Sequence, residues 1–74
     1  MKIDKEFIEV KIEEQNLVIQ ELEKSSDRIS SLKEEVHSNE AREVLGLSLK
    51  EIDRALNIEE DILEELNNDL ARFE

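Results

Sequence analysis

The chain has 74 residues, of which 42% are charged, and its formal net charge is −11 at pH 7. It contains no cysteine and no proline, and its only glycine is Gly46. This length allows one domain over residues 1–74, and the lack of cysteine excludes disulfides and thiolate metal sites. Because so short a chain buries little surface as a monomer, we expect it to gain stability by self-association.

The first residues, MKIDKEF, are charged, and no apolar run that could form a signal-peptide core or a membrane span follows them. We therefore expect a cytoplasmic protein without a membrane partner.

Apolar residues in the first half recur at intervals of three and four, which is typical of a helix that turns one stripe toward a partner helix. Only two members of this stripe are polar; it comprises Ile8, Ile12, Gln15, Ile19, Leu22, Ser25, Ile29, Leu32 and Val36. The pattern predicts a helix over about residues 3–36. Phe7, Val10 and Leu17 widen the stripe beyond what one partner helix covers, so we expect them near a homodimer interface.

A polar turn is predicted at about residues 37–39, because Ser38 and Asn39 are good N-caps and Glu40 suits the first turn of a helix. A second helix is then predicted over about residues 40–73. Its apolar stripe has one polar member and comprises Leu45, Leu49, Ile52, Leu56, Glu59, Leu63, Leu66, Leu70 and Phe73. Two such helices form an all-α antiparallel hairpin, and we expect it to dimerise into a four-helix bundle.

Local signals in the second half favour an alternative in which this helix is kinked or broken near Gly46 or Asn57. Gly46 could adopt the left-handed conformation that ends a helix. Ser48 and Glu51 have the spacing of a capping box for the next one. This interpretation gives three short helices over residues 39–45, 49–56 and 59–73.

The stretch around Gly46 resembles the helix-turn-helix of sigma-factor region 4 and related transcription regulators. The matching positions are Gly46, Leu47, Ser48, Lys50, Glu51, Ile52, Leu56 and Ile58. The resemblance implies a DNA-reading element, but Asp53 replaces the small alanine that the family buries between its helices. The segment that would enter the major groove opens with Glu59, Glu60 and Asp61 and has no residue suited to reading bases. Direct nucleic-acid binding is therefore disfavoured.

The strongest charge lies at the C-terminal end, where residues 59–74 contain seven acids and one base, Arg72. Glu60, Asp61, Glu64 and Glu65 fall off the apolar stripe and are the predicted partner-binding residues. Carboxylates at this density favour a protein partner with a basic surface. They are also typical of inhibitors that imitate the phosphates of DNA.

Chemistry of other kinds has little support. Glu34 and His37 have the Glu-x-x-His spacing of metal-binding bundles, but His37 falls at the predicted turn. No serine or cysteine nucleophile is paired with a base, and no glycine-rich phosphate loop is present. We expect no enzyme activity, no cofactor and no metal.

These observations favour a small non-enzymatic protein that binds and regulates or inhibits a protein partner, in the manner of antitoxins, antirepressors or phage-encoded inhibitors. The first alternative is a structural, assembly or secretion-associated helical hairpin. The second is a transcription regulator of the helix-turn-helix type, which the charge disfavours.

Overall fold

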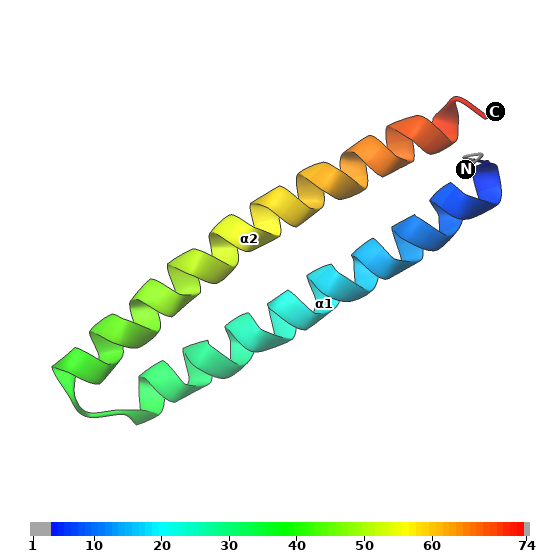
Figure 1. The fold of residues 1–74 in the computed structure, drawn as a ribbon. Coiled ribbons are helices and arrows are strands. Elements are labelled where there is room, and N and C mark those ends of the chain that lie inside the picture. Colours follow the sequence, from blue (N-terminus) through cyan, green and yellow to red (C-terminus); the bar gives the residue numbers. More distant parts are fainter. Residues whose placement is uncertain (1–3, 74) are drawn as a thin grey trace.

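The computed structural model describes residues 4–73, which form two long helices that lie side by side and antiparallel (Figure 1). Helix α1 spans Lys5–Glu35 and helix α2 spans Asn39–Ala71, with residues 36–38 between them. The predicted antiparallel hairpin is confirmed. The two helices start and end within two residues of the expected bounds, although the expected start at residue 3 lies outside the described residues.

Both helices begin at a side-chain cap. The Phe7 backbone N–H donates to the Asp4 carboxylate over 2.9 Å. The Ala41 N–H donates to the Ser38 hydroxyl over 3.3 Å, as expected for an N-cap serine. In the loop, the Arg42 side chain donates from Nε to the Val36 carbonyl over 3.0 Å. These bonds hold donors and acceptors that the helix ends leave unpaired, and they keep the connection short.

The apolar stripes of the two helices face each other and form a single seam. Ile8 and Ile19 are buried, with 4% and 9% of their surface exposed. Most other seam side chains are half-buried, whereas Leu32 and Phe73 at the two ends are each 47% exposed. Two helices make one layer, so each seam residue is covered by one neighbouring helix only. The described part of the chain therefore has a small core.

Two of the three polar members of the seam meet in the hairpin. Gln15 donates from Nε2 to the backbone carbonyl of Glu59 over 2.8 Å, and also to the Glu59 carboxylate. Both side chains are half-buried, and no buried side-chain polar atom in the described residues lacks a partner. This contact defines the observed register, in which residue 15 of α1 lies level with residue 59 of α2.

Helix α2 continues without a break through Gly46 and Asn57, so the alternative with three short helices is wrong. No residue from 4 to 73 has a positive φ, which rules out the left-handed helix end expected at Gly46. Ser48 does not cap a new helix; its hydroxyl donates to the Val44 carbonyl one turn earlier, over 3.2 Å. The helix-turn-helix shape is therefore absent from residues 39–71.

Replacing Gly46 with alanine is expected to stabilise the protein by about 0.5–1 kcal/mol, because alanine is the better helix former. A Cβ at this position would lie 3.5 Å from the Lys33 ammonium, which is an ordinary contact with the end of a flexible side chain. Urea unfolding followed by circular dichroism measures the change. A loss of stability would indicate that Gly46 serves a bend that only glycine allows.

Candidate functional site

The four predicted partner-binding residues form an acidic patch on α2, which we define as Glu60, Asp61, Glu64 and Glu65. All four side chains are exposed. Their spacing places them on two adjacent ridges of the helix. The seam residues between and beside them, Leu63 and Leu66, are half-buried against α1. The patch therefore lies on the side of α2 that points away from α1.

The patch concentrates negative charge. Glu60 and Glu64 are four residues apart, as are Asp61 and Glu65, so the helix carries two like-charged neighbour pairs. Each such pair destabilises a helix by about 0.2–0.5 kcal/mol. The next bases along α2 are Arg54 on one side and Arg72 beyond its end, and the last turn of α2 contains no base. Among residues 4–73, no ion pair involves any residue of the patch.

The ion pairs in the described residues are local. Each joins side chains three residues apart in one helix, for example Lys11 with Glu14 over 3.2 Å and Arg72 with Asp69 over 3.7 Å. Their side chains are mostly exposed, so each pair contributes little to stability. The two helices are therefore held together by the apolar seam and by the contact between Gln15 and Glu59.

The residues expected at a dimer interface lie on α1, but they are not equivalent. Phe7 is half-buried, and the Lys11 ammonium lies 5.5 Å from the centre of its ring. Val10 and Leu17 are 47% and 61% exposed. They are seven residues apart, and each lies two positions from a buried seam residue, which places them on the side of α1 remote from α2. The structure thus leaves two of the three available to a partner, and their role at an interface stays a prediction.

Glu34 and His37 do not form part of a recognisable metal site. Glu34 is exposed in the last turn of α1, and His37 is exposed in the loop. Among residues 4–73, no three His, Cys, Asp or Glu side chains are grouped so that they could hold a metal ion. In the same residues, neither helix is long and apolar enough to cross a membrane.

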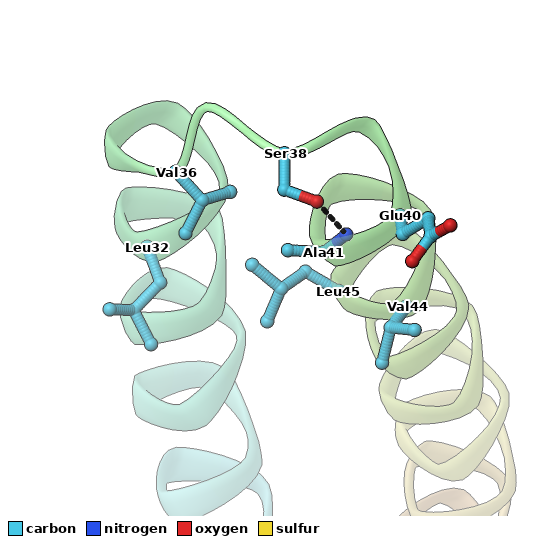
Figure 2. A pocket seen from close by; sticks show the side chains of 7 residues that line it. All are labelled: Leu32, Val36, Ser38, Glu40, Ala41, Val44 and Leu45. Carbon is cyan, nitrogen blue, oxygen red and sulfur yellow. Dashed lines mark hydrogen bonds between the residues drawn. The ribbon is translucent and has the colours of Figure 1, made fainter.

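Sequence reasoning assigned no role to a row of apolar side chains that border the seam. Near the loop, Leu32 of α1 and Val44 of α2 line one hollow together with Val36, Ala41 and Leu45 (Figure 2). Leu32 is 47% exposed and Val44 is 61% exposed. A signal was present in the sequence, because Val44 directly precedes a seam residue, as Ile58 and Ile62 do further along α2.

Comparison of the chain with protein-family models, with curated proteins and with solved structures found no match. The class of protein that the geometry defines is thus the acidic two-helix hairpin, and its function is argued from its own surfaces.

Proposed function

We propose that this chain is a non-enzymatic protein that binds a protein partner through the acidic patch and thereby regulates or inhibits it. The observation that carries the proposal is the alignment of Glu60, Asp61, Glu64 and Glu65 on the outward side of α2, where all four are exposed. A partner with a basic surface fits this patch best, because opposite charges steer the two proteins together.

The cost of the patch to the chain itself supports a role in binding. The two like-charged pairs in the patch oppose helix formation. The last turn of α2 also contains no base, and Arg72, which follows at the C-cap, is paired with Asp69. Helix α1 differs, since Lys33 lies in its last turn. Charges that destabilise their own helix are well suited to interaction with a partner that neutralises them.

The partner surface that we propose is one that otherwise binds nucleic acid. Carboxylates spaced along a helix resemble the phosphates of a nucleic-acid backbone in sign and density, and a groove rich in Lys and Arg recognises both. Direct binding of DNA by this chain is not proposed, because the charge of the patch has the wrong sign.

Exchanging all four patch residues for glutamine tests the proposal. Glutamine keeps a comparable helix propensity, so the helical circular dichroism signal is expected to persist. Partners captured from a native extract by the unmodified protein are first identified and purified. Their association rate with the variant is expected to fall about tenfold or more at low salt, and its salt dependence is expected to weaken.

The matched control removes four exposed charges from α1 instead, at Glu9, Glu13, Glu23 and Glu34. This control changes the net charge equally and is expected to bind the partner nearly as fast as the unmodified protein. Equal losses in both variants would mean that net charge alone drives association. Binding that is indifferent to the patch variant would place the functional surface elsewhere. Displacement of the partner by duplex DNA tests the finer proposal.

A structural or assembly role is the second candidate, and the exposed apolar side chains next to the seam favour it. In that case the captured partner would be another helical subunit, and the patch variant would assemble normally.

A further inference from the structure

Nine large apolar side chains in the described residues are 40–61% exposed, and five of them lie on one side of the hairpin. We call this set the apolar face: Val18, Leu32, Val44, Ile58 and Ile62. Of the acidic patch, only Glu65 lies on the flank of α2 that borders this face, so the role of the face is argued separately from the proposed function.

The residues of the apolar face lie on one side of the hairpin. In α1, Val18 and Leu32 are fourteen residues apart, and in α2 Ile58 follows Val44 by the same interval, which is about four helical turns. Ile62 follows Val44 by eighteen residues, or about five turns. Leu32 and Val44 line the same hollow on either side of Leu45 (Figure 2). The remaining members, in phase with these two, therefore extend the same side along both helices.

The opposite side of the hairpin is polar. Val18, Val44, Ile58 and Ile62 each directly precede a seam residue, whereas the residues that directly follow seam positions lie on the other flank of the same helix. Apart from Gly46 and Ala71, those following positions are polar in both helices and most are exposed, for example Glu9, Asn16, Glu23, Asp53, Glu60 and Asn67. The hairpin thus has one apolar side and one polar side, and the apolar seam lies between its two helices.

The register of the hairpin places apolar residues of α1 and α2 at the same height, that is, at the same position along the hairpin axis. Because Gln15 contacts Glu59, residues whose numbers add up to about 74 lie level with each other. Val18 is therefore nearly level with Ile58, and Leu32 is nearly level with Val44. Each helix carries its half of the apolar face at matching heights.

We propose that a second copy of this chain covers the apolar face and forms a four-helix bundle whose twofold axis runs parallel to the helices. This axis keeps every residue at its height and brings α1 of one copy against α2 of the other, again antiparallel. Val18 then packs on the partner's Ile58, and Leu32 packs on the partner's Val44. The seam, in which only Ile8 and Ile19 are buried within the single hairpin, becomes the interior of the bundle.

Charge supports a second copy as the occupant. The flank of α1 that borders the apolar face carries three bases and three acids that directly precede seam residues: Lys11, Lys24, Arg28, Glu14, Glu21 and Glu35. The same flank of α2 carries Glu51, Glu65 and Asp69, and its one base, Arg72, follows beyond the end of the helix. The twofold axis sets the mixed flank of one copy against the acidic flank of the other. In this arrangement Lys11 comes level with the partner's Glu65, with the same offset that relates Val18 to Ile58.

Disulfide cross-linking between two single-cysteine variants tests the arrangement, because the chain has no cysteine of its own. We expect an equal mixture of V18C and I58C to form a covalent dimer under mild oxidation, faster than either variant alone. Each chain carries one thiol, so the product can arise only between chains. The control mixture of N16C with I58C is expected to react slowly, since Asn16 is exposed on the opposite, polar side of the hairpin.

Sedimentation equilibrium of the unmodified protein and of two charged variants gives an independent measurement. The unmodified protein is expected to be a dimer at micromolar concentration. Ile58→Glu is expected to weaken the dimer about tenfold or more, because a carboxylate would be buried in the bundle. Asn16→Glu, on the opposite side of the hairpin, should leave it unchanged. A monomeric unmodified protein, or a dimer lost with Asn16→Glu and kept with Ile58→Glu, would overturn the proposal. So would a mixture of V18C and I58C that reacts no faster than its separate components.

Discussion

Replacing Ile19 with alanine is expected to lower the free energy of unfolding by about 2–4 kcal/mol, which is a large share of the stability of so small a domain. Ile19 is 9% exposed and lies in the middle of α1, where the seam is best covered. Truncation there removes buried methyl groups and leaves a cavity that two rigid helices fill poorly. Urea unfolding at matched protein concentration measures the loss.

Two further truncations calibrate this result. Leu22→Ala is expected to cost less than Ile19→Ala, because Leu22 is only half-buried. Leu17→Ala is expected to change the stability by about 0.5 kcal/mol or less, since 61% of this side chain is exposed. Equal losses at Ile19 and Leu17 would mean that the seam lies on another side of α1.

The contact between Gln15 and Glu59 is expected to show strong coupling. Gln15→Leu removes the donor that pairs with the Glu59 carboxylate and carbonyl. It leaves a half-buried charge facing an apolar side chain, and we expect a loss of about 1–3 kcal/mol. The double variant Q15L/E59L is expected to be more stable than either single variant, because two leucines pack in the seam without desolvating a charge.

A double-mutant cycle from the unfolding free energies of the four proteins measures this coupling. Glu59→Gln is the matched control, because an amide keeps the size of the side chain and still accepts from Gln15. Additive effects of Q15L and E59L would show that the two residues do not interact in solution.

The long-range apolar pattern predicted the hairpin because burial decides the phase of a long helix. Leu45, Leu49 and Ile52 keep the seam in register across Gly46, and a break there would turn these side chains away from α1. The local signals for a helix break are weaker than the burial of the seam. The capping box at Ser48 and Glu51 and the glycine at position 46 together contribute about as much as one or two buried leucines. The continuous helix keeps all of the seam.

The surfaces were predicted less completely than the seam. Exposure of the acidic patch follows from its spacing within one helix, so the sequence alone was sufficient. The meeting of Gln15 with Glu59, and of Leu32 with Val44 across one hollow, depends on the register between the helices. The three-residue loop and the hydrogen bond from Arg42 to Val36 determine that register. The apolar periodicity within one helix carries no information about it.

Both proposed surfaces require that α2 is one unbroken helix, and a distance between two spin labels on it tests this most directly. Glu43 precedes Gly46 in the chain and Asn68 follows Asn57, so the two sites enclose both possible breaks. Both side chains are exposed, and they are about seven helical turns apart. Double electron–electron resonance on E43C/N68C, diluted with unlabelled protein, is expected to give one narrow distribution. Its centre is expected at about 38 Å, because 25 residues of an α-helix rise by that length. A markedly shorter or broad distribution would contradict the account, because a helix broken at Gly46 or Asn57 folds back on itself.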